Sequence, residues 1–71
     1  MFNESMRFND RLRELREEKE MLQQHLASLL QVQQATVSAW ELGKNEPSIE
    51  MLKKLAIVLD CDVNYLVGFS D

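Results

Sequence analysis

Glutamine side chains are concentrated in one segment of the chain that carries no formal charge. Residues 21–40 contain five glutamines and no Asp, Glu, Lys or Arg, and His25 is the only titratable side chain among them. A glutamine amide offers a hydrogen-bond donor beside an acceptor, the pair of groups that matches the major-groove edge of adenine. A surface without carboxylates also lets phosphate groups approach, whereas the plainer alternative is a solvated, glutamine-rich helical hairpin. The five residues are Gln23, Gln24, Gln31, Gln33 and Gln34.

Net charge argues against a polyanionic partner, but the distribution of charge does not. The 71 residues carry a net charge of −4 and a pI near 4.9, whereas nucleic-acid-binding domains usually show a basic footprint. The acidic excess lies before residue 21 and after Trp40. Net charge therefore predicts weak non-specific attraction to nucleic acid and leaves specific recognition to neutral side chains.

Composition excludes several other classes of protein. Cys61 is the only cysteine, so an internal disulfide or a cysteine metal cluster is impossible, which fits a reducing cytoplasm. No apolar run approaches the length of about 18 residues that indicates a membrane span, and no signal peptide is visible. The sequence shows no glycine-rich phosphate loop and no catalytic pairing of His, Cys or carboxylate residues. We therefore expect no enzyme activity, no metal or other cofactor and no small-molecule site.

Hydrophobic periodicity predicts an all-α fold of five helices without strands. Ser48 and Asp62 are suitable N-caps for the last two helices, and Gly43 and Gly68 are suitable residues to end the third and the fifth. The predicted helices cover residues 5–19, 23–30, 33–41, 49–59 and 63–67. The expected core consists of Phe8, Leu12, Leu15, Leu26, Leu29, Leu30, Val37, Trp40, Ile49, Leu52, Leu55, Ala56 and Leu59, and the last helix contains Val63, Leu66 and Val67.

The second and third predicted helices are joined by a tight turn at Gln31 and Val32, which is the helix-turn-helix arrangement. Ala27 is small enough to let the two helices approach closely, and Val37 and Trp40 supply apolar contacts. We expect one domain spanning residues 1–71, with the helix-turn-helix at about residues 23–42.

Three stretches of the sequence together resemble a known family. Residues 23–44 read QQHLASLLQVQQATVSAWELGK, residues 11–19 read RLRELREEK, and residues 47–59 read PSIEMLKKLAIVL, followed by NYLVG at residues 64–68. These motifs resemble the Cro and phage-repressor type of helix-turn-helix domain, also called the xenobiotic-response-element family. The resemblance implies a five-helix, lambda-repressor-like bundle that binds double-stranded DNA sequence-specifically as a repressor-like transcriptional regulator. Its third helix would lie in the major groove.

The sequence departs from the family pattern at three positions. Gln31 stands where the family usually has glycine, and a left-handed backbone there costs a glutamine about 1 kcal/mol. Leu22 replaces the usual threonine cap, and a leucine side chain accepts no hydrogen bond. Leu42 replaces an asparagine that binds the DNA backbone. The third helix also lacks Arg and Lys, so the frequent arginine–guanine contact is absent from it.

The resemblance assigns site residues position by position. Because glutamine pairs with adenine and alanine contacts thymine methyl groups, we expect an A·T-leaning half-site. Arg16 and Glu41 match a pair that bridges the first helix to the end of the third, and Thr36 is equally suited to packing. The base contacts are Gln33, Gln34, Ala35, Ser38 and Ala39, and the phosphate contacts are Gln23, Thr36, Lys44, Asn45 and Arg16.

Helix-turn-helix proteins read paired half-sites as two-fold dimers, so we expect a homodimer on a pseudo-palindromic operator. The resemblance places the dimer contact near the last helix, at Val63, Tyr65 and Val67, although scattered surface apolarity is the alternative reading. A second function remains open, namely an antitoxin-like protein–protein interaction module of the same fold with weak or no DNA affinity.

Overall fold

A computed structural model describes residues 7–69 of the chain, and these residues form five helices and no strand. The all-α prediction is therefore confirmed, and the second helix has the bounds that its periodicity predicts. The first helix begins later than predicted, although residues 5 and 6 lie outside the described part, and the third begins one residue later because Gln33 is its N-cap. The helices are α1 (Phe8–Glu18), α2 (Gln23–Leu30), α3 (Gln34–Glu41), α4 (Ile49–Val58) and α5 (Val63–Leu66).

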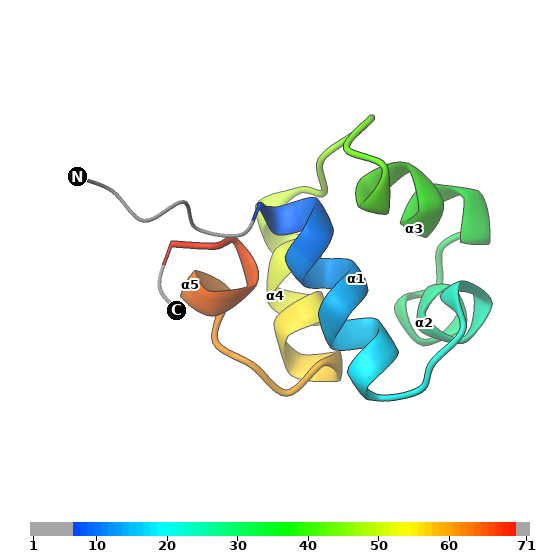
Figure 1. Cartoon of the computed structure of the whole chain (residues 1–71). Helices are drawn as coiled ribbons and strands as arrows, with labels where there is room; N and C mark the ends of the chain where they lie inside the picture. Colours follow the sequence, from blue (N-terminus) through cyan, green and yellow to red (C-terminus); the bar gives the residue numbers. More distant parts are fainter. Residues whose placement is uncertain (1–6, 70–71) are drawn as a thin grey trace.

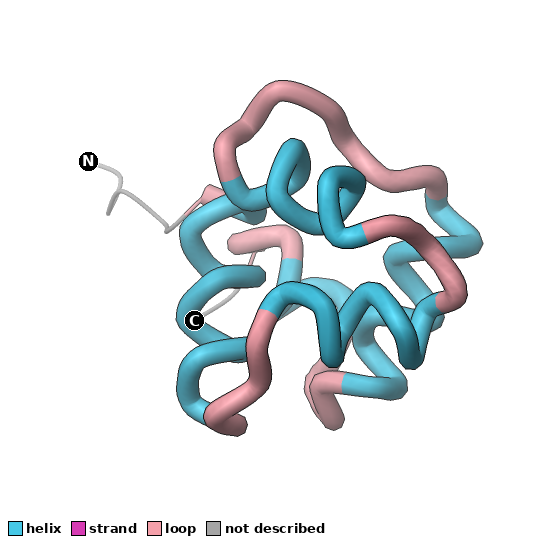
Figure 2. Tube along the Cα trace, turned by 90° about the vertical axis from the view of Figure 1, so that its right-hand side faces the viewer, coloured by secondary structure: helices cyan, strands magenta, loops and turns pink. Residues whose placement is uncertain are grey.

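Helix α1 stands between the helix-turn-helix pair and the last helix (Figure 1). Helices α2 and α3 pack against each other, and α3 also packs against α1. Helix α4 contacts α2 and α5, and α5 contacts α1. Figure 2 shows the same chain turned by 90°, with short loops between consecutive helices and a longer one between α3 and α4. The arrangement leaves α3 and α5 on different sides of the molecule.

Every helix, or the residue that caps its end, contributes a fully buried aliphatic side chain to one core. Trp40 is also buried there, as the sequence predicts. Burying each of these aliphatic groups contributes roughly 1.5–3 kcal/mol, so the core holds the helix-turn-helix and α5 to the same framework. The fully buried side chains are those of Leu12, Leu26, Leu55, Leu59, Leu66 and Val37.

Two core predictions are wrong. Leu29 is 59% exposed, because the buried face of α2 is formed by Leu26, Ala27 and Leu30 and Leu29 lies to the side of it. Ile49 is 73% exposed, since it is the first residue of α4 and that helix becomes buried only toward its C-terminal end. Periodicity identifies the apolar face of a helix but not how far along the helix the core extends.

The two predicted caps are confirmed. The Ser48 hydroxyl accepts a hydrogen bond from the backbone N–H of Met51 at 3.1 Å, and the Asp62 carboxylate accepts one from that of Asn64 at 2.9 Å. Each bond satisfies an N–H group in the first turn of its helix, which otherwise lacks a partner within the helix. These two caps set the starting points of α4 and α5.

Helix α2 begins without a side-chain acceptor at its cap, as the leucine there predicts. Instead, the imidazole of His25 accepts a hydrogen bond at Nδ1 from the backbone N–H of Leu22, at 3.3 Å. This contact holds the entry of the chain into α2 but leaves the first N–H groups of the helix without a side-chain cap. His25 is itself exposed, and helical periodicity does not reveal this contact.

The turn between α2 and α3 has the left-handed backbone that its place in the family pattern requires. Gln31 has φ 61° and ψ 41°, so the backbone of this residue adopts the left-handed conformation that suits glycine. Glu20 and Asp60 likewise have positive φ where α1 and α4 end. Three helices therefore end on strained, non-glycine residues.

Replacing Gln31 by glycine is expected to stabilise the fold. The Gln31→Gly variant should raise the free energy of unfolding by up to about 1 kcal/mol, because glycine adopts the left-handed conformation without the Cβ clash. Urea unfolding followed by circular dichroism measures the change. Gln31→Ala keeps the Cβ and is the matched control, and equal stability of the two variants would show that the turn is unstrained.

Candidate nucleic-acid interface

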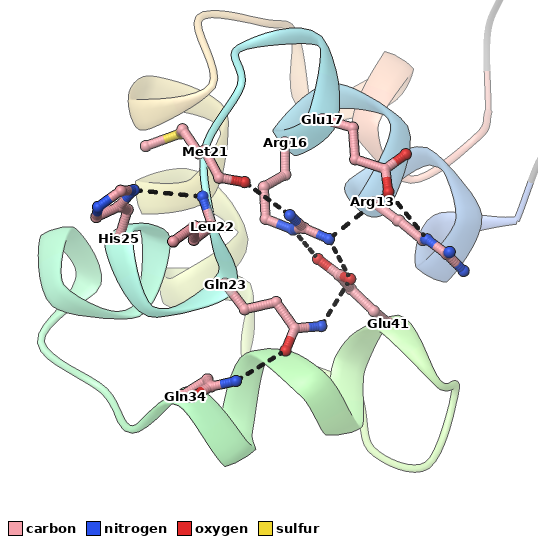
Figure 3. A network of polar contacts seen from close by, with 9 residues as sticks. All are labelled: Arg13, Arg16, Glu17, Met21, Leu22, Gln23, His25, Gln34 and Glu41. Atoms are coloured by element: carbon pink, nitrogen blue, oxygen red, sulfur yellow. Dashed lines mark hydrogen bonds and ion pairs between the residues drawn. The ribbon is translucent and has the colours of Figure 1, made fainter.

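A buried ion pair joins α1 to the C-terminal end of α3 (Figure 3). The guanidinium of Arg16 donates from Nε to Oε2 of Glu41 at 2.6 Å and from Nη2 to Oε1 at 3.0 Å, and both residues are buried. Its Nη1 donates to the backbone carbonyl of Met21 at 2.7 Å. Hydrogen bonding to Glu41 raises the pKa of Arg16, against the lowering effect of burial, so the group is permanently charged. The pairing that the family resemblance implied is confirmed as a structural bridge.

Two glutamines extend this ion pair to the surface of α3. The side chain of Gln23 donates from Nε2 to Oε1 of Glu41 at 3.0 Å, and Gln34 donates from Nε2 to Oε1 of Gln23 at 3.3 Å. Figure 3 shows the four side chains in sequence from Arg16 to Gln34. We refer to Arg16, Glu41, Gln23 and Gln34 as the amide relay.

The direction of every hydrogen bond in the amide relay follows from its buried end. A guanidinium only donates and a carboxylate only accepts, so the Gln23 amide must present its NH₂ to Glu41 and its oxygen outward. Gln34 must then present its NH₂ to Gln23. One N–H and the oxygen of the exposed Gln34 amide are left for a partner outside the chain.

The predicted base contacts lie together on α3 and its cap. Gln33, Gln34 and Ala35 are exposed at the N-terminal end of the helix, and Ser38 and Ala39 are half-buried one turn further on. None of these side chains is charged, and the acidic residue at the end of the helix is turned inward in the amide relay. The surface is therefore neutral but rich in hydrogen-bonding groups.

The predicted phosphate contacts lie in three different environments. Lys44 and Asn45 are exposed in the loop after α3, and Gln23 is half-buried at the N-terminus of α2, so all three border the face of α3. Thr36 is half-buried. Arg16 lies in the interior, where its N–H groups are directed at Glu41 and the Met21 carbonyl, and this geometry favours a structural role over a phosphate contact.

The predicted dimer residues are all half-buried on or beside α5. Val63 and Val67 are four residues apart and share one side of the helix. Tyr65 instead contacts α1, where its ring centroid lies 3.9 Å from the guanidinium carbon of Arg11. Sequence reasoning missed Arg11, although its spacing of four residues from Leu15 places both on one face of α1.

Two further classes of site have no support within the described residues. Between positions 7 and 69, no group of three or more His, Cys, Asp or Glu side chains is arranged to hold a metal ion. In the same part of the chain, no helix combines the length and the apolarity that crossing a bilayer requires.

Comparison with known proteins identifies the same helical unit elsewhere. A family model described as helix-turn-helix matches residues 12–66. The HTH-type transcriptional activator BcrR of Enterococcus faecalis is 36% identical over 63 residues, which are 89% of this chain and 31% of that protein. The chain spans between 31% and 52% of the length of the curated relatives that it matches first.

Solved structures share the fold closely. The P22 c2 repressor in complex with a synthetic operator matches with a TM-score of 0.86 at 27% identity, over 93% of this chain and 100% of that chain. The hydroxypropylphosphonic acid epoxidase from S. wedmorenis matches with a TM-score of 0.79 at 36% identity, over 84% of this chain but 32% of that chain. The same unit thus occurs both in a repressor and as about a third of an enzyme.

Removing one partner of the buried ion pair is expected to unfold much of the protein. Glu41→Leu leaves the Arg16 guanidinium buried without a carboxylate, which costs about 3–5 kcal/mol. The double variant Arg16→Met/Glu41→Leu should recover most of that loss, because an apolar pair of similar volume is often neutral or stabilising. Urea unfolding of the original protein and the two variants gives the comparison, and a double variant no more stable than Glu41→Leu would contradict the expectation.

Proposed function

The chain belongs to the helix-turn-helix family, in its Cro and phage-repressor type, and on this premise we propose that it is a sequence-specific regulator of transcription that binds double-stranded DNA. The observation that carries the proposal is the amide relay, which presents one amide of fixed orientation on the exposed face of α3. The P22 c2 repressor, which shares the fold, forms a complex with a synthetic operator.

In this proposal α3 enters the major groove and its N-terminal residues contact base edges. The remaining N–H of Gln34 donates to N7 of adenine and its oxygen accepts from N6, so the orientation imposed by the amide relay matches adenine and not guanine. Gln33 makes a second amide contact and the Ser38 hydroxyl contacts either kind of base. Ala35 and Ala39 contact thymine methyl groups, which gives an A·T-leaning half-site.

Phosphate groups on either side of the groove would be held by the start of α2 and the end of α3. The first N–H groups of α2 lack a side-chain cap, and such groups bind phosphate with the help of the helix dipole. The second N–H of Gln23 lies at the same place, so one residue would bind phosphate and orient Gln34. Lys44 and Asn45 supply the contacts beyond α3, and Thr36 adds a hydroxyl from the first turn of that helix.

A second copy of the chain would double the recognition surface. Helix-turn-helix proteins read half-sites about one helical turn of DNA apart as two-fold dimers, so the operator is pseudo-palindromic. We place the dimer contact at α5, with Val63, Tyr65 and Val67 as the predicted residues. Ile57 and Phe69, which are 79% and 82% exposed, add apolar surface on the neighbouring segments.

The proposal assigns recognition and not catalysis to this chain. The epoxidase resembles it over about a third of the enzyme's length, so the shared unit does not by itself account for that chemistry. Because a regulator of this kind must reach the DNA that it controls, we propose a cytoplasmic location. We also propose that it represses transcription by occupying an operator.

Substituting the oriented amide is expected to weaken and broaden DNA recognition. After selection of an operator from random double-stranded DNA, Gln34→Ala should bind it about ten- to a hundredfold more weakly, because a bidentate base contact contributes about 1–3 kcal/mol of discrimination. Fluorescence anisotropy with the operator and with a variant lacking the contacted adenine measures both effects. Gln24→Ala is the control, because Gln24 is exposed on α2 outside the amide relay, and equal behaviour of the two variants would remove Gln34 from the base contacts.

A phosphate contact at Lys44 is expected to appear in the salt dependence of binding. The slope of log affinity against log salt should decrease by roughly 1 in Lys44→Ala, because one counterion fewer is released. Lys53→Ala, an exposed lysine on α4, should leave the slope unchanged. Absence of any DNA binding at low salt would instead favour the protein–protein interaction module.

A further inference from the structure

Arg11 is a buried cation that forms no ion pair with the residues that the structure describes. Only 6% of its surface is exposed, and its Nε has no hydrogen-bond partner among the described residues. The ion pairs that residues 7–69 form involve Arg13 and Arg16 but not Arg11. Nε is the atom of this side chain that is buried without a hydrogen bond, and a buried N–H group without a partner costs free energy unless another contact compensates for it.

That contact is the aromatic ring of Tyr65. The guanidinium carbon lies 3.9 Å from the ring centroid, well within the range of a cation–π interaction. The ring covers one face of the guanidinium, as a planar group allows. The stack links α1 to α5, whose Leu66 is fully buried in the core.

Helix α5 needs such a link because it is very short. It contains four residues, and a helix of this length does not form without tertiary contacts. Its N-cap Asp62 sets where it begins, and Leu66 and the half-buried Val63 pack against the core, where α4 also contacts α5. The stack of Tyr65 on Arg11 adds a contact directed toward α1, which restricts the rotation of α5 about its own axis.

We propose that Arg11 is a positioning residue for dimerisation: by stacking on Tyr65 it fixes the rotation of α5 that turns Val63 and Val67 toward a second copy of the chain. The proposal rests on the dimer described above and changes the role of Tyr65. The tyrosine acts within its own chain, and the two valines make the contact between copies.

The charge of Arg11 favours the same association. Each copy carries a net charge of −4, and two copies repel each other. The acidic residues Asp60 and Asp62 lie just before α5. Burial is the main cause that raises the pKa of the Cys61 thiol, and these two carboxylates raise it further, whereas the nearby charges of Lys19 and Arg11 lower it. Arg11 therefore places a positive charge among the acidic groups nearest the proposed contact.

Dimer dissociation and local hydrogen exchange test the proposal together. Arg11→Met should weaken the dimer at least about threefold in analytical ultracentrifugation, because a cation–π contact is lost. Amide exchange should accelerate at Val67 and Phe69, which follow α5 and whose N–H groups donate to the carbonyls of Val63 and Asn64, and should stay unchanged in α2 and α3. Tyr65→Phe keeps the ring and is the matched control, with both measurements as in the original protein.

A double variant separates the stack from general packing. Tyr65→Leu should weaken the dimer more than Arg11→Met does, because it leaves the guanidinium buried with no compensating contact. Arg11→Met/Tyr65→Leu should then dimerise better than Tyr65→Leu alone. Simple multiplication of the two single effects would show that the residues act independently and would overturn the proposal.

Three other results would also overturn it. Unchanged dimer affinity and α5 exchange in Arg11→Met would show that the stack positions nothing, and faster exchange throughout the chain would make Arg11 a general stability residue. If the original protein stayed monomeric at high micromolar concentration, with and without operator, the proposed dimer itself would be disproved. In that last case, binding of a single half-site that still depends on Gln34 would leave the proposed DNA recognition standing.

Discussion

The bidentate contact between Arg16 and Glu41 is the interaction on which the DNA-facing surface depends. Both charges are buried, and their removal from water is compensated only because each remaining donor and acceptor has a partner. The partners are the carbonyl of Met21, in the loop that leads into α2, and the amide of Gln23 at its start. One buried pair thus joins α1, the entry of α2 and the end of α3, so the angle between the two helices of the motif is held from the interior.

The same pair decides the chemistry of the surface, because hydrogen bonds have a direction. Guanidinium groups donate, carboxylates accept, and the two amides must follow in turn. The exposed end of this relay is a neutral side chain whose orientation is set by a charge that solvent does not reach. An acidic protein can therefore present a face suited to DNA, with its discrimination carried by oriented amides and only a small contribution from long-range electrostatic attraction.

Helix α1 carries a second arginine with a different environment and a different consequence. Arg11 and Arg16 are five residues apart, so they point in directions roughly 140° apart around the helix. One contacts a carboxylate on the side of α3, and the other contacts an aromatic ring on the side of α5. Both arginines are buried, so α1 is a rigid support between the surface proposed to read DNA and the surface proposed to bind a second copy.

The sequence by itself determined the five helices, the bounds of α2 and the caps at Ser48 and Asp62, because each follows from interactions within a few residues. The resemblance of its motifs added the left-handed turn at Gln31 and the pairing of Arg16 with Glu41. Local spacing could not say that Leu29 and Ile49 lie outside the core, since that depends on where neighbouring helices end. Only the tertiary structure decided that Gln23 orients Gln34 and that Arg11 stacks on Tyr65. The first two residues are separated by 11 positions in the sequence and the second two by 54, and no periodic pattern encodes their proximity.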